Sequence, residues 1–202
     1  MAGTSLPQKK VLIFMQAIEA LLRRHSARAL KEPAPDAAAL GLILECATRA
    51  ADHGRLRPWR FIVIQGENRA RFGELLAEHL RRAKASISDE ALERERQKAF
   101  RAPLIVAVAA IITRDGKIPE IEQVISAGAA AQNMLHASLA LGFNGVWKTG
   151  GAAYDEQVKA ALGLESKDGI VGFLYLGTDE DGPGSLPRPD WSRFVEHWRP
   201  IR

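Results

Sequence analysis

A continuous apolar run, PLIVAVAAII at residues 103–112, constrains the fold of this 202-residue chain more than any other segment. The run carries no charge and is rich in β-branched residues, which is typical of a strand that is buried on both faces. Helices must then cover the sheet on each side of that strand. We therefore expect residues 103–112 to form a central strand of a layered fold.

Other segments add strands and amphipathic helices in an irregular order. Further strands are expected at FIVIQG (61–66), FNGVWKTGG (143–151) and GIVGFLYLG (169–177). Helices are expected at about 36–49, 67–84, 90–103, 120–142 and 154–162, the first of them capped by Asp36. No G-x-G-x-x-G sequence follows a first strand, and there is no Walker A sequence. The pattern predicts an α+β, three-layer α/β/α fold.

Both ends of the chain carry apolar residues that need a surface to cover them. Near the N-terminus the apolar residues have the spacing of an amphipathic helix rather than that of a signal peptide: Ile13, Met15, Ile18, Leu21 and Leu22. The tail at 183–202 contains Trp191, Phe194 and Trp198, and rings of that size are seldom left in water. We expect this tail to extend from one domain that spans residues 1–202.

The composition favours a soluble, cytoplasmic protein. No apolar segment approaches the length of a membrane span, so no membrane association is expected. The single cysteine, Cys46, excludes an internal disulfide and fits a reducing compartment. The chain has 28 basic and 24 acidic residues, and an anionic ligand explains this mild excess as well as nucleic acid does.

Several classes of enzyme lack support in the sequence. The five histidines are scattered without the spacing of metal ligands, so no metal site is expected. There is no G-x-S-x-G elbow, and no pair of carboxylates stands out. We therefore expect no side chain that acts as a nucleophile or as a general acid or base.

Basic and hydroxyl groups gather in three places instead. These are RRHSAR at 23–28, the loop RAADHGRLRPWRF at 49–61, and GVWKTGG at 145–151. The arginines and the serine of RRHSAR suit a phosphate monoester. Each Arg offers paired donors, and the Ser hydroxyl can donate a hydrogen bond to a remaining phosphate oxygen. A solvated helix end explains that stretch as well, so the stretch alone leaves both interpretations open.

Taken together, the three places resemble the FMN-dependent nitroreductase family. RRHSARAL is similar to the R-R-S-x-R sequence that opens the family, and AADHGRLRPWRFIVI resembles its P-S-x-x-N-x-Q-P-W-x-F block. LALGFNGVWKTG resembles the block in which a long helix ends beneath the flavin, and VGFLYLGT matches the final core strand. The order and spacing agree over about residues 15–180. The chain looks closest to the small, single-domain bacterial NAD(P)H nitroreductases.

The resemblance implies a mixed sheet flanked by helices and an obligate homodimer with FMN at the interface. By this resemblance the cofactor-binding residues would be Arg24, His25, Ser26, Arg28, Arg49, His53, Trp147, Lys148 and Thr149. The group at 24–28 would hold the phosphate and the ribityl chain, while Arg49 and His53 would reach the flavin from the partner subunit. Residues 147–149 would lie against the isoalloxazine ring.

The loop at 49–61 also departs from the family pattern. Ala51, Arg55 and Arg57 stand where many members have Pro, Asn and Gln, which leaves the contacts to the pyrimidine edge of the flavin open. Either arginine could stabilise an anionic reduced flavin, or both could be solvated.

The resemblance also implies an activity. NADH or NADPH would reduce FMN at N5, and a nitroaromatic, quinone or similar conjugated acceptor would then reoxidise it, so the flavin carries the chemistry. Two alternatives remain at this point. One is a non-catalytic flavin-binding or regulatory protein. The other is a nucleic-acid-binding module that uses RRHSAR and RLRPWR, with Trp59 as a stacking ring.

Overall fold

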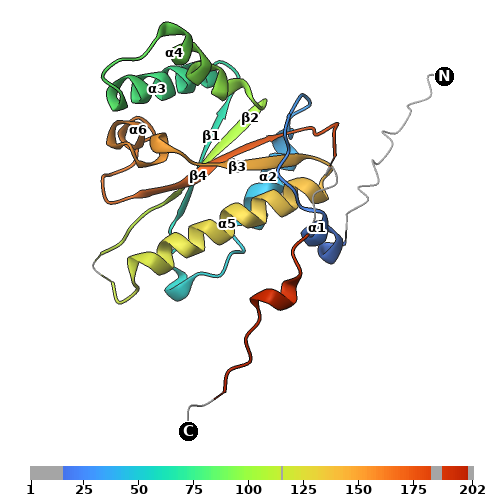
Figure 1. The fold of residues 1–202 in the computed structure, drawn as a ribbon. Helices are drawn as coiled ribbons and strands as arrows, with labels where there is room; N and C mark the ends of the chain where they lie inside the picture. Colours follow the sequence, from blue (N-terminus) through green and yellow to red (C-terminus); the bar gives the residue numbers. More distant parts are fainter. Residues whose placement is uncertain (1–15, 115, 183–187, 200–202) are drawn as a thin grey trace, which may run out of the picture.

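A four-stranded sheet forms the middle of the molecule in the computed structural model, which describes residues 16–114, 116–182 and 188–199. Its strands are β1 (Trp59–Gln65), β2 (Leu104–Ala110), β3 (Asn144–Lys148) and β4 (Gly169–Gly177), in the order β1-β2-β4-β3 (Figure 1). All seven residues of β2 are buried, which confirms the central strand predicted from the apolar run. The two outer strands, β1 and β3, are its edges.

Helices cover both faces of the sheet, and this confirms the three-layer α+β fold. The helices are α1 (Ala17–Arg23), α2 (Ala37–Ala47), α3 (Asn68–Ala83), α4 (Asp89–Arg96), α5 (Glu120–Ala140) and α6 (Glu156–Ala161). Figure 1 shows α3, α4 and α6 on one side of the sheet and α5 on the other. Successive side chains of a strand alternate in direction, so Ile105 joins the core beneath α3 while Val106 joins the core beneath α5. None of these helices is both long and apolar enough to cross a membrane.

Local signals explain where α2 and α5 begin. The Asp36 carboxylate accepts a hydrogen bond from the Ala39 amide at 2.8 Å, as the predicted N-cap of α2. Pro119 precedes the first turn of α5. That turn contains Glu120 and Glu122, whose negative charges interact favourably with the positive end of the helix dipole. At the N-terminus, Ile18, Leu21 and Leu22 lie on α1 or its last turn and are exposed, whereas Ile13 and Met15 lie outside the described residues.

The sheet differs from the expected mixed sheet, because its three strand pairs are all antiparallel. Strands β2 and β3, which α5 connects, run in the same direction and would form a parallel pair if they were neighbours. Instead, β4 lies between them and runs against both. The last strand of the chain therefore decides the pairing, and no local pattern in β2 or β3 indicates this.

The small residues of α5 are used within the chain. Ala127, Ala130 and Ala131 are completely buried against the sheet and α2. Ser126 is also buried, and its hydroxyl donates to the Ala51 carbonyl at 2.8 Å. Gly128 and Ala129 of the same turn are only half-buried.

A close packing contact between β4 and β3 leads to a first prediction. A Cβ atom added at Gly172 would lie 2.0 Å from Nε1 of Trp147, so Gly172→Ala must displace the indole. We expect this overpacking to lower the free energy of unfolding by about 1–3 kcal/mol, measured by urea denaturation. Gly169→Ala, also in β4 but with no atom near its added methyl group, is the matched control. Equal losses in the two variants would contradict the packing argument.

Candidate functional site

A cavity of about 340 Å³ lies between the segment that follows α1 and the edge strand β3. Its polar lining consists of Ser26, Arg28, Arg101, Lys148 and Tyr175, and its apolar lining of Ala27, Leu30 and Val146. The segment runs alongside β3, where the Ala27 amide donates to the Gly145 carbonyl at 3.3 Å. The structure thus brings together Ser26, Arg28 and Lys148, three of the residues predicted to bind the cofactor.

His25 anchors this segment from beneath. Its ring is buried, with Nε2 at 2.7 Å from Oδ2 of Asp179 and Nδ1 at 3.1 Å from the Arg23 carbonyl oxygen. Asn144 at the start of β3 also donates to Asp179, at 2.7 Å. Burial opposes ionisation of Asp179, but the hydrogen bonds from His25 and Asn144 outweigh it and lower the pKa of this carboxyl. His25 therefore holds its neighbours in position and does not itself line the cavity.

The cavity is positively charged and has no acidic lining. Neither Arg28 nor Lys148 forms an ion pair with any residue that the structure describes, although several exposed arginines and lysines elsewhere do. Unpaired cations around one cavity repel each other unless an anion lies among them. Guanidinium, ammonium and hydroxyl donors are the groups that bind a phosphate monoester, so the lining fits the phosphate of FMN.

The alternation along β3 separates the predicted residues 147–149. Val146 and Lys148 face the cavity, while Trp147 points to the opposite face and packs in the core beneath α5. The Trp147 indole N–H donates to the Val171 carbonyl at 3.2 Å. Thr149 is exposed beyond the end of β3 and does not line the cavity. A contact of Trp147 or Thr149 with the flavin ring stays a prediction.

Contacts from α3 to the half-buried Asp155 fix the turn that follows Thr149. His79 and Arg82 on α3 both contact Asp155, which caps α6, and each N–O distance is 2.9 Å. Burial raises the pKa of Asp155, but the hydrogen bonds from His79, from the Val158 amide and from Arg82 dominate and lower it to about 2. The turn after β3 is therefore fixed to α3.

The remaining predicted residues lie away from the cavity. Arg24 is half-buried. The pKa of His136 on α5 is lowered, mainly because His136 is partly buried and further because the positive charge of Arg24 is nearby. Arg49 is exposed just after α2. His53 is exposed as well, with Nδ1 at 2.6 Å from Oε2 of Glu122 on α5. Neither Arg49 nor His53 lines this cavity, and their contact with the flavin of a partner subunit stays a prediction.

The loop that carries the departures from the family pattern has an unusual backbone. Arg55 and Arg57 have φ angles of 57° and 52°, a left-handed region that residues with a side chain rarely adopt. The Arg57 amide donates to the Asp52 carboxylate at 2.8 Å, which holds the loop in this conformation. Both arginine side chains are exposed. Such strain is common at binding sites.

Sequence reasoning missed Arg101 and Tyr175. Arg101 belongs to the charged stretch at 90–103 that is predicted as a helix, and Tyr175 lies within the apolar strand β4. No local signal distinguishes either of them. Only the pairing of Tyr175 with Val146, across β3 and β4, places that ring beside the cavity.

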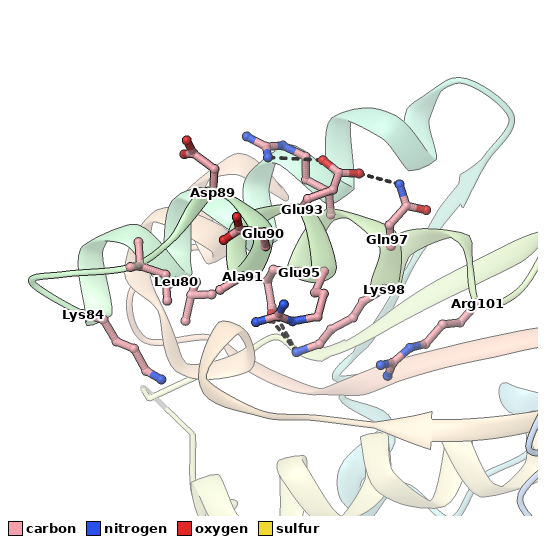
Figure 2. A pocket seen from close by; sticks show the side chains of 13 residues that line it. Leu80, Lys84, Asp89, Glu90, Ala91, Glu93, Glu95, Gln97, Lys98 and Arg101 are labelled. Atoms are coloured by element: carbon pink, nitrogen blue, oxygen red, sulfur yellow. Dashed lines mark hydrogen bonds and ion pairs between the residues drawn. The ribbon is translucent and has the colours of Figure 1, made fainter.

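A larger cavity of about 1110 Å³ adjoins α4, and its lining is of mixed charge (Figure 2). Figure 2 shows Lys84, Lys98 and Arg101 on one side of α4, with Asp89 and Glu93 on the other. Many of its charges are paired, such as Lys98 with Glu95 and Arg96 with Glu93. Arg101 lines both this cavity and the smaller one. Among the described residues, no group of His, Cys, Asp or Glu could hold a metal ion.

Exposed apolar side chains lie apart from both cavities. They form two groups, Ile18, Leu21 and Leu22 on α1 and Ile121, Val124 and Ile125 on the first turns of α5. The tail rings Trp191, Phe194 and Trp198 are exposed as well, and Figure 1 shows the tail running away from the body of the molecule. Groups of exposed apolar side chains are candidates for protein–protein contact.

Comparison with known proteins gives consistent matches. The family model described as "Nitroreductase family" matches residues 21–178. The Escherichia coli K12 protein named "Putative NAD(P)H nitroreductase YdjA" is 41% identical over 185 residues, which cover 91% of this chain and 100% of that protein. A nitroreductase-like protein of Bacillus cereus superposes with a TM-score of 0.79 at 22% identity, covering 93% of this chain and 98% of the other. A Desulfovibrio desulfuricans protein solved with FMN has a TM-score of 0.69 at 25% identity, covering 98% and 100%.

Proposed function

Because the chain belongs to the nitroreductase family, we propose that it is an FMN-dependent oxidoreductase. It uses NADH or NADPH to reduce nitroaromatic, quinone or similar conjugated acceptors. The chemistry that FMN supplies when bound is hydride transfer through N5, in a ping-pong order. The proposal includes a cytoplasmic location, for which the single cysteine, Cys46, is the support.

One observation carries the proposal more than any other, namely the cationic cavity beside β3. Ser26 and Arg28 come from the RRHSAR stretch and Lys148 from the GVWKTGG stretch, so two blocks that are far apart in the sequence meet at one cavity. Their donors bind the FMN phosphate and thereby set the position of the whole cofactor. His25 keeps Ser26 and Arg28 in place through its contact with Asp179.

The protein's own part in the reaction is binding and orientation. No side chain has to act as a nucleophile or as a general acid or base, because the redox chemistry would belong to the bound flavin. Lys148 lies at the last position of β3, the edge strand, and its positive charge favours an anionic group beside that edge.

A homodimer with FMN at the interface is part of the same proposal. The apolar residues of α1 and α5 and the rings of the tail are exposed in the single chain, and a second copy would cover them. Arg49 and His53 would then approach the flavin held by the partner, along with the strained loop at Arg55 and Arg57.

An absorption spectrum of the purified protein tests the proposal. We expect a yellow protein with about one FMN per chain that NADH or NADPH bleaches under anaerobic conditions. A nitroaromatic or a quinone added next should restore the colour. A colourless protein would favour the nucleic-acid-binding module. A yellow protein that neither nicotinamide bleaches would favour the non-catalytic flavin-binding protein.

A further inference from the structure

Arg101 lies at the cationic cavity although it belongs to neither of the sequence blocks that form it. It follows the short helix η2 (Gln97–Phe100) and precedes β2, and it lines the cavity with Ser26, Arg28 and Lys148. All three cations of the cavity, Arg28, Lys148 and Arg101, lack an ion-pair partner among the described residues. Arg101 therefore adds a third positive charge where two already repel each other.

A candidate partner for Arg101, the Glu95 carboxylate, is already occupied. Glu95 lies six residues earlier in the chain, and its charge and that of Arg101 both act on Tyr175. Both oxygens of the Glu95 carboxylate accept hydrogen bonds from Lys98, at 2.7 and 2.6 Å. The arrangement neutralises Lys98 and leaves the Arg101 guanidinium free to bind another anion.

The backbone around Arg101 is fixed on both sides. Arg69 of α3 lies over the Phe100 ring, with Cζ at 5.4 Å from the ring centroid, and its Nη1 donates to the Ala102 carbonyl at 3.1 Å. Pro103 packs against the strand end at Gly177, where an added Cβ would lie 2.9 Å from its ring. An arginine held on so rigid a turn loses little backbone freedom when it binds a ligand.

Tyr175 adds a neutral hydroxyl group to the same lining. Burial raises the pKa of Tyr175 to about 12, and the nearby charges of Arg101 and Glu95 oppose each other there. The phenol therefore remains protonated near neutral pH and can donate a hydrogen bond to an anion without adding negative charge.

We infer that Arg101 is a further cofactor-binding residue, which completes the phosphate site that Ser26, Arg28 and Lys148 begin. This inference rests on the proposed function, because the anion is the phosphate monoester of FMN. A dianionic phosphate among three cations is well matched in charge. The turn before β2 is then part of the cofactor site and more than a connection between helix and strand.

The test compares FMN with riboflavin, which lacks the phosphate. In Arg101→Ala we expect the Kd for FMN to rise about tenfold or more, and the Kd for riboflavin to change by less than about twofold. Equilibrium dialysis of the full-length chain gives both constants. Arg101→Lys keeps the charge but not the paired donors, so it should recover part of the FMN affinity. Arg94→Ala removes an exposed arginine of α4 that does not line this cavity, and it should behave like the wild type.

Three outcomes would overturn the inference. If Arg101→Ala binds FMN as tightly as the wild type, Arg101 does not contact the phosphate, while the proposed function stands. If Arg101→Ala binds FMN and riboflavin more weakly by the same factor, Arg101 stabilises the fold or contacts the flavin ring and does not contact the phosphate. If the wild-type chain binds neither flavin, the proposed function fails and this inference fails with it.

Discussion

Arg28→Ala is expected to weaken FMN binding by about a hundredfold, because a paired contact to phosphate contains two charge-assisted hydrogen bonds worth roughly 1.5–3 kcal/mol each. Arg28 is exposed at the rim of the cavity and forms no ion pair with a described residue, so its loss should leave the fold intact. The Kd for FMN measures the loss of binding, and thermal melting of the same sample measures any loss of stability.

Riboflavin and His25 provide the controls for this variant. Riboflavin binding should be nearly equal in the wild type and in Arg28→Ala, because riboflavin has no phosphate to lose. His25→Ala should instead lower the melting temperature, since it leaves Asp179 buried without one of its partners. Wild-type protein that binds riboflavin as tightly as FMN would exclude a phosphate site at this cavity.

Ile125→Glu is expected to dissociate the proposed homodimer. Ile121 and Ile125 lie one turn apart on α5 and are 62% and 61% exposed in the single chain. In a dimer with twofold symmetry the substitution places two carboxylates in an apolar interface, and each unpaired buried charge costs about 3–5 kcal/mol. Sedimentation velocity at micromolar concentration should therefore show a monomer, with weaker FMN binding if residues of the partner complete the site.

Ile125→Leu is the matched control, because it keeps the apolar area and nearly the same volume. It should sediment as the wild type does. If Ile125→Glu remains a dimer with unchanged stability, this part of α5 is not the interface. A wild-type chain that is monomeric with FMN bound would contradict the dimer itself.

Elements whose residues are neighbours along the chain could be predicted from the sequence alone. The apolar run at 103–112 predicted β2, and Asp36 predicted the start of α2, because strand burial and helix capping are read over a few consecutive residues. The RRHSAR block indicated Ser26 and Arg28 as phosphate-binding candidates for the same local reason, namely the type and spacing of their side chains. Lys148 entered only through the family resemblance, which implied a place against the isoalloxazine ring.

How these elements meet depends on the packing of the whole chain. The position of β4 between β2 and β3 makes the strand pairs antiparallel, and the alternation along β3 places Lys148 at the cavity and Trp147 in the core. Packing of the turn before β2 against the end of β4 brings Arg101 to the same cavity. These placements depend on contacts between residues far apart in the chain, and a pattern read over a few consecutive residues cannot predict the energy of such contacts.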